Sequence, residues 1–209
     1  MNESLSSRFI GCLDLETIRE KVTVRPEPVG NLSDLDYLVS AEIFSSALKS
    51  IFIPNDFCLS FIKEMATQAW LHSQSLFSTE REYLSKIYSP PDVEVAPVCL
   101  TGLAGVGKSQ TVAALRKVLP PPMEFSSNHF NKSIELVSYW YASARGKAGG
   151  RQILSDFLSD QKINSRNAAQ LLIDCRRRVN RDGVSLLILE ETQHISTGSG
   201  ASKVTDILL

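Results

Sequence analysis

The sequence predicts an α/β fold in which a parallel sheet lies between layers of helices. Three observations lead to this prediction: a glycine-rich loop between an apolar run and a helical pattern, a later apolar run that ends in two carboxylates, and alternating strand-like and helix-like segments between them. Chains with this alternation form right-handed crossovers and parallel strands. The segment that precedes the α/β part shows helical patterns and no strand-like ones.

The glycine-rich loop covers residues 102–109 and reads Gly-Leu-Ala-Gly-Val-Gly-Lys-Ser, a complete G-x-x-x-x-G-K-[ST] motif. The apolar run 97–100 before it predicts a buried strand. The segment 111–119 after it predicts a helix, which the three prolines at 120–122 end. Because a strand, a glycine loop and a helix follow one another in this order, the sequence predicts a phosphate-binding P-loop.

Each residue type of this loop has a chemical role. The glycines let the backbone approach an anion, the loop amides form a nest for phosphate oxygens, and the helix adds the positive end of its dipole. The expected nucleotide-binding residues are Gly102, Ala104, Gly105, Val106, Gly107, Lys108, Ser109 and Gln110. Lys108 provides a charge for the β- and γ-phosphates, and the Ser109 hydroxyl is a candidate Mg²⁺ ligand.

The second motif is the apolar run 184–189, which Glu190 and Glu191 follow directly. This pattern is typical of a central parallel strand, and ligands of open α/β sheets bind at the carboxyl ends of the strands. We therefore predict that Glu190 binds Mg²⁺, directly or through water, and that Glu191 is the catalytic base for the attacking water, with Lys108 as the other catalytic residue. Alone, the acidic pair would more often be a solvated strand end.

Residues 186–195, Leu-Leu-Ile-Leu-Glu-Glu-Thr-Gln-His-Ile, resemble the hydrophobic run and D-E-A-Q-H-L signature of AAA-type ATPases, in particular the TniB/TnsC-type helper ATPases of DNA transposition. The strand expected over 134–141, before a glycine-containing turn and a helix, is also similar to that branch. The resemblance covers residues 96–209. It implies a P-loop three-layer α/β sandwich, ATP with Mg²⁺, homo-oligomerisation on DNA, and a transposase or target-selection protein as partner.

The chain departs from this family pattern in two places. Glu190 stands where the family has Asp, and because Mg²⁺ tolerates little distortion of its ligands we expect nucleotide binding to survive and hydrolysis to be weakened. AAA-type domains also continue with a sensor strand, an arginine finger and a helical lid, whereas this sequence stops just after a helix expected from residue 202. We therefore expect a fold that is incomplete at the C-terminal end, with no assignable sensor or arginine finger.

The expected organisation has three parts: a flexible arm over 1–32, a helical extension over 33–92, and the P-loop core over 93–209. Helical spacing predicts one helix over 34–52 and another over 79–88. Between them we expect a second helix that begins after Asn55 or Asp56 as its cap. In the core we expect a strand over 133–141, a loop over 142–150, and helices over 152–158 and 166–180, the last ended by Asp182 and Gly183. The apolar stripe of the second helix is interpreted as packing on the neighbouring domain, with partner docking as the less common alternative.

The composition restricts the partners. A net charge of −1 provides no global attraction to nucleic acid, so the two arginine-rich clusters, 145–151 and 176–181, are interpreted first as solvated surface and second as DNA or subunit contacts. Four dispersed cysteines without metal-ligand spacing and no membrane-length apolar run favour a cytoplasmic protein. The alternatives to a transposition ATPase are a P-loop ATPase of a defence or signalling system and a truncated, non-catalytic adaptor.

Overall fold

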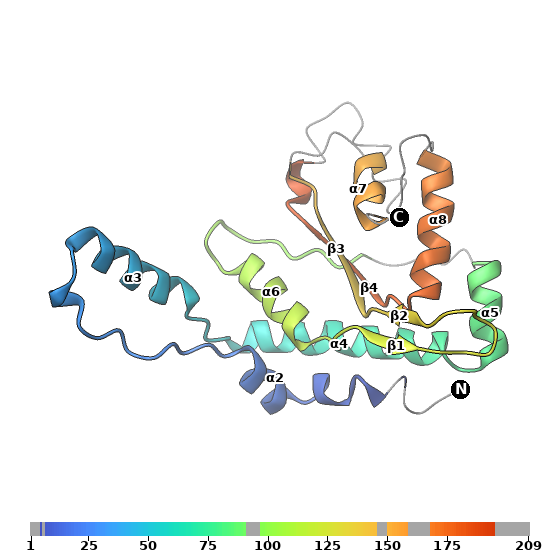
Figure 1. Cartoon of the computed structure of the whole chain (residues 1–209), viewed down its shortest axis with the longest axis horizontal. Helices are drawn as coiled ribbons and strands as arrows, with labels where there is room; N and C mark the ends of the chain where they lie inside the picture. Colours follow the sequence, from blue (N-terminus) through green and yellow to red (C-terminus); the bar gives the residue numbers. More distant parts are fainter. Residues whose placement is uncertain (1–4, 6, 91–96, 146–149, 159–167, 195–209) are drawn as a thin grey trace.

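The computed structural model describes residues 5, 7–90, 97–145, 150–158 and 168–194. Within these residues the chain has a mixed α/β structure with seven α-helices and two small sheets, which confirms the predicted fold class at this level. The boundary expected near residue 92 between helical extension and core falls in 91–96, outside the described residues. Figure 1 shows α2 and α4 below the sheets, α3 at the far left and α5 at the right.

Helix α2 (Leu15–Val22) lies in the segment 1–32, so the prediction of a flexible arm is wrong for these residues. Asp14 caps the helix, because its carboxylate accepts a hydrogen bond from the backbone N–H of Thr17 at 2.8 Å. Ile18 and Val22, one turn apart, are fully buried against other helices. Only two residues form the buried face, which is too short a pattern to indicate a helix by its period. The 3₁₀ turns η1 (Ile10–Cys12) and η2 (Leu32–Asp34) flank this region.

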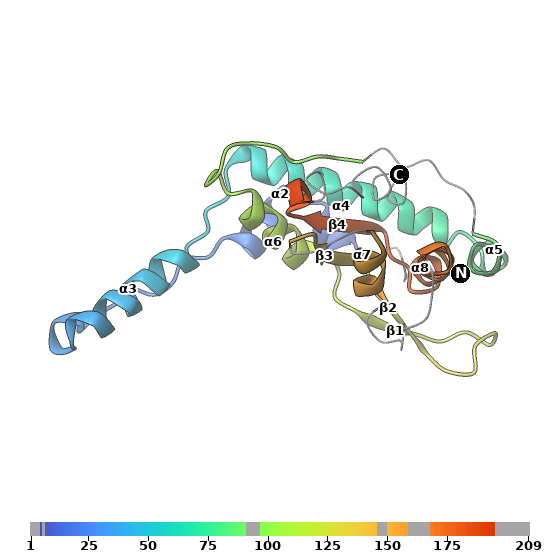
Figure 2. The same ribbon diagram turned by 90° about the horizontal axis from the view of Figure 1, so that it is seen from above.

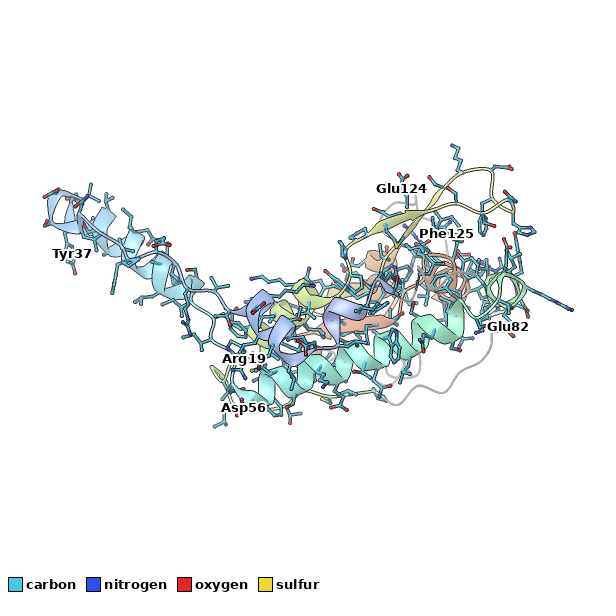
Figure 3. All side chains as sticks on the ribbon, turned by 90° about the horizontal axis from the view of Figure 1, so that it is seen from below. Arg19, Tyr37, Asp56, Glu82, Glu124 and Phe125 are labelled. Carbon is cyan, nitrogen blue, oxygen red and sulfur yellow. The ribbon has the colours of Figure 1, made fainter. Side chains whose placement is uncertain are left out.

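Helix α3 (Tyr37–Ser50) lies within the predicted helix 34–52 and projects away from the body of the molecule (Figures 1 and 2). None of its residues is buried. An antiparallel bridge between Val24 and Phe52 closes the base of the projection. Arg19 of α2 lies 3.8 Å from Asp56 at the same base, and Figure 3 shows both far from Tyr37 at the other end of the projection. The exposed large apolar side chains of α3 include Tyr37, Leu38, Val39, Ile43, Phe44 and Leu48.

Helices α4 (Asp56–Leu76) and α5 (Glu80–Tyr88) agree with the predicted helices, and α4 also agrees with its predicted cap. The Asn55 side chain caps α4 by accepting a hydrogen bond from the N–H of Cys58 at 2.8 Å, and Thr79 caps α5 in the same manner. Most of the apolar stripe of α4 is buried, with Ile62 and Ala69 fully inaccessible, whereas Phe57 in its first turn is 64% exposed. The interpretation that this stripe packs within the molecule is therefore confirmed for its buried residues and not for Phe57.

The strand expected over 133–141 is divided between two sheets. Strand β1 (Met123–Phe125) pairs antiparallel with β2 (Ile134–Leu136), and strand β3 (Tyr139–Ser143) pairs parallel with β4 (Leu186–Glu190). The chain leaves one sheet for the other at Ser138, whose buried hydroxyl donates a hydrogen bond to the carbonyl of Pro120 at 2.6 Å. The sequence shows one continuous β-rich run, and only the pairing partners decide where it divides.

The strand predicted over 97–100 is not formed, and this is a second correction. Val98 is 61% exposed, and among the described residues β4 pairs with β3 alone. An apolar run of four residues becomes a strand only when a neighbouring strand accepts its backbone hydrogen bonds, and Pro97 has no N–H to contribute.

Helices cover both faces of the parallel pair β3–β4. Side chains alternate across each strand, so Tyr139, Leu186 and Ile188 face α6 (Lys108–Val118) and its neighbours. Trp140 and Leu189 face the opposite layer, formed by α7 (Gly150–Phe157) and α8 (Ala168–Arg181). Figure 1 shows α6 on one side of the strands and α7 and α8 on the other. The sheet therefore lies between two helical layers.

Candidate functional site

The predicted phosphate loop leads directly into α6. Gly107 is the N-cap residue of this helix with φ +89°, and Gly105 has φ +83°, both in the left-handed region that favours glycine. No side chain of the described residues caps the helix, and its first turn carries no acidic residue. The first amide groups of α6 therefore have neither a side-chain acceptor nor a nearby negative charge from their own helix.

Lys108 folds back over the loop that precedes it. Its ammonium group donates hydrogen bonds to the carbonyl oxygens of Gly102 and Leu103, at 2.7 Å each. Ser109 and Gln110 follow as exposed residues of the first helical turn, and Ala104 and Val106 are exposed in the loop. All the predicted nucleotide-binding residues thus lie on one loop and one helical turn, with a positive charge held at the loop itself.

The loop is attached to the rest of the protein through Thr111. The Thr111 hydroxyl donates a hydrogen bond to the carbonyl of Gly107 at 3.0 Å and lies 3.1 Å from the sulfur of Cys58 on α4. Both side chains are buried. The sequence alone does not indicate this contact, because neither residue belongs to a motif that predicts it.

The acidic end of β4 lies in the sheet, on which α6 packs from one side. Glu190 is the last residue of β4 and pairs in register with Ser143 of β3. It follows Ile188 at the strand period, so its side chain is on the sheet face that α6 covers. The Glu190 carboxylate accepts a hydrogen bond from the Tyr141 hydroxyl at 2.6 Å. This hydrogen bond, with burial as a smaller cause, raises the pKa of Tyr141, so the phenol keeps its proton.

Glu191 has a backbone conformation that is uncommon for its residue type. Its φ of +58° lies in the left-handed region, where a residue with a side chain is strained. The side-chain amide of Gln193 donates a hydrogen bond to the Glu191 carboxylate. Such strain is concentrated at functional positions, which is consistent with the role predicted for Glu191. Gln193 belongs to the 3₁₀ turn η3 (Thr192–His194), and the side chain of His194 lies outside the described residues.

An arginine connects the loop helix to the acidic strand end. Arg116 of α6 lies over the ring of Tyr141, with its guanidinium carbon 4.1 Å from the ring centre. Its Nε also donates a hydrogen bond to the hydroxyl of Tyr139 at 3.4 Å. The structure thus joins α6 to Glu190 through Arg116 and Tyr141, two residues that the sequence analysis did not identify. The alternation of Tyr139 and Tyr141 along one strand face is the signal that could have indicated them.

The two predicted metal ligands lie on different elements, Ser109 on α6 and Glu190 on β4. In both views β4 ends at η3 on the side where the loop before α6 lies (Figures 1 and 2). Among the described residues, no group of three or more His, Cys, Asp and Glu side chains could hold a metal ion by itself. A hydroxyl and a carboxylate are hard oxygen donors, which suit Mg²⁺ in combination with phosphate oxygens and water.

The two arginine-rich clusters have different environments. Arg178 and Arg181 each bind the buried carboxylate of Asp182, at 3.0 and 2.7 Å, so these two side chains stabilise the end of α8. Arg145, Arg151, Arg176 and Arg177 are exposed, as expected for a solvated surface or a contact surface. Lys147 lies outside the described residues.

No model of a known protein family matches the sequence, and no curated protein matches it either. Within the described part of the chain, no helix combines the length and apolar character needed to cross a membrane.

Proposed function

We propose that this chain binds ATP with Mg²⁺ on the loop 102–109 of a P-loop, AAA-type sandwich, and that it hydrolyses the nucleotide. The observation that carries the proposal is the start of α6, where left-handed glycines precede a helix without a side-chain cap or an acidic first turn. The unpaired amides and the helix dipole favour an anion at this position. Lys108 adds a formal positive charge to the same loop.

The proposed roles follow from the chemistry of the side chains. Lys108 exchanges its two loop carbonyls for phosphate oxygens, a stronger, charge-assisted interaction. Ser109 and Glu190 hold Mg²⁺, which, when bound, neutralises charge on the phosphates. Glu191 orients a water molecule and accepts its proton, while Gln193 holds the Glu191 carboxylate.

Nucleotide binding is tested with Lys108→Ala and, as the matched control, Lys117→Ala, which removes an exposed lysine from the other end of the same helix. Titration with a fluorescent ATP analogue should show binding weakened about 10- to 100-fold in the first variant, because a charge-assisted contact is lost. The control should bind like the wild type. Equal binding by both variants, or no binding by the wild type, would refute the proposal.

Hydrolysis is tested separately by single-turnover measurements on Glu191→Gln. This change keeps the size of the side chain and removes its basicity, so we expect the rate of hydrolysis to fall about 100-fold or more while ATP affinity stays the same. A rate equal to that of the wild type would exclude Glu191 as the base.

We further propose that the ATPase assists DNA transposition as a homo-oligomer on DNA, with a transposase or target-selection protein as partner. The similarity of residues 186–195 to the transposition helper signature supports this setting. The alternative is a P-loop ATPase of a defence or signalling system, which would bind and hydrolyse ATP with the same residues. A non-catalytic adaptor is favoured by one observation, the exposed apolar surface of α3.

These three roles differ in the effect that nucleotide should have on assembly of the protein on DNA. Sedimentation of the protein with duplex DNA, with and without a non-hydrolysable ATP analogue, should show assembly that requires the nucleotide if the helper role is correct. Loss of DNA binding under all conditions would contradict that role, even if ATP binding were intact.

A further inference from the structure

The acid at the end of β4 has more conformational freedom than the aspartate of the family pattern. Glu190 has one more methylene and therefore one more side-chain torsion to restrain before its carboxylate can hold a metal ion. Mg²⁺ requires nearly ideal positions of its ligands. A glutamate at this position therefore needs a neighbour that fixes its carboxylate group.

Tyr141 has the geometry of such a neighbour. Its hydroxyl donates a hydrogen bond to one oxygen of the Glu190 carboxylate at 2.6 Å, in a partly buried environment. The bond uses that oxygen as acceptor and leaves the second oxygen of the carboxylate for another partner. Tyr141 and Glu190 lie on adjacent, paired strands, so the backbone ladder fixes the separation of the two side chains.

The ring of Tyr141 is itself held from the other side. The guanidinium of Arg116 lies 4.1 Å from the centre of this ring, within the range of a cation–π contact. Arg116 belongs to α6, the helix that begins with Lys108. The same helix therefore carries the loop lysine at its first residue and fixes the tyrosine with a later residue.

We propose that Tyr141 is a positioning residue that orients the Glu190 carboxylate for Mg²⁺, with Arg116 holding the tyrosine ring against the end of β4. This inference rests on the proposed binding of ATP and Mg²⁺. Because the contacts of Tyr141 are with Glu190 and Arg116, we expect its removal to affect the metal dependence of binding and to leave the metal-free affinity unchanged.

The test compares Tyr141→Phe with Tyr139→Phe. Both changes remove one hydroxyl from the same strand and the same sheet face, and both tyrosines contact Arg116, but only Tyr141 contacts Glu190. Binding of a fluorescent ADP analogue is measured in EDTA and then against increasing MgCl₂. Direct binding of Mn²⁺ in the presence of ADP is measured by electron paramagnetic resonance.

We expect Tyr141→Phe to bind the analogue in EDTA like the wild type and to need about tenfold more Mg²⁺ for half-maximal enhancement, the usual effect of losing a residue that orients a metal ligand. Mn²⁺ affinity should fall by the same factor. Tyr139→Phe should match the wild type in both measurements. A Mg²⁺ dependence of Tyr141→Phe equal to that of the wild type would overturn the inference while the proposed function stood.

Two further measurements separate positioning from a general loss of structure. In a Glu190→Gln background, adding Tyr141→Phe should cause no additional change in Mg²⁺ dependence, because the carboxylate that Tyr141 orients is already lost. Effects that multiply in the double variant would contradict the inference. If the wild type binds the analogue neither in EDTA nor with Mg²⁺, the proposed function fails and this inference fails with it.

Discussion

The end of α8 offers a prediction that does not depend on the proposed function. Gly183 has φ +68° and completes a Schellman motif, since the N–H of Val184 bonds to the carbonyl of Val179 at 2.9 Å and that of Gly183 to Asn180 at 3.3 Å. This turn directs the chain from α8 into β4 and so determines where Glu190 lies. A β-carbon at Gly183 would lie 2.9 Å from Cζ of the buried Phe77.

The expected effect of Gly183→Ala is the sum of two costs. Left-handed strain costs about 1–2 kcal/mol, and forcing a methyl group against a packed ring costs about 1–3 kcal/mol. The free energy of unfolding should therefore fall by about 2–5 kcal/mol, and in a chain of this length the melting temperature should fall by about 4–20 °C. Urea unfolding followed by circular dichroism, together with thermal melts, measures both quantities.

Two other glycines separate the two costs. At Gly105, also left-handed, nothing lies within 4 Å of an added β-carbon, so Gly105→Ala should show strain alone; Gly30→Ala, with open space and no left-handed φ, should change stability very little. Adding Phe77→Leu to Gly183→Ala should cost less than the sum of the two single changes, because the shorter side chain relieves the contact. The reasoning is refuted if Gly183→Ala is as stable as Gly30→Ala.

Three further predictions concern other parts of the fold. Burial raises the pKa of Cys175 to about 12. The folded state therefore keeps a proton on this thiol that the unfolded state releases above about pH 8.5. The stability that this group contributes is complete below that pH and is lost as the pH rises toward 12. Urea unfolding between pH 8 and pH 10.5 should show a smaller alkaline loss for Cys175→Ala, whereas the exposed Cys99→Ala should leave the slope unchanged. Asn55→Ala should lower the free energy of unfolding by about 1 kcal/mol through loss of the α4 cap, and Asn55→Asp, which can still accept the bond, should not. Phe44→Lys on α3 should leave the melting temperature nearly unchanged and reduce binding of a hydrophobic dye, and a large loss of stability would contradict the exposed position of this helix.

Much of the local structure could be predicted because few neighbouring residues determine it. Asn55 and Thr79 cap helices by bonding to amides three residues away, and Gly183 ends α8 because only glycine adopts its conformation without strain. The glycines of the loop 102–109 and the strand before Glu190 belong to the same class. Their patterns lie within one short segment of sequence.

The candidate site could be predicted only in part, since a motif names residues but does not show what surrounds them. The acidic pair at the end of β4 and the loop lysine were recognisable from their order and spacing. Arg116 and Tyr141, which connect these two elements, belong to no motif and have meaning only when α6 packs on the sheet. The prediction of a strand at 97–100 is wrong for the same reason, because a strand forms only where a partner strand accepts its hydrogen bonds.

The amino-acid order by itself determined the start of α4 at Asn55, the end of α8 at Gly183 and the position where carboxylates follow β4, because hydrogen bonds and backbone sterics act over a few residues. Tertiary structure alone decided that α2 is buried, that α3 is exposed, and that Tyr141 meets Glu190. These outcomes depend on contacts between segments far apart in the chain, where burial of apolar surface and the pairing of strands select one arrangement among many that the local patterns allow.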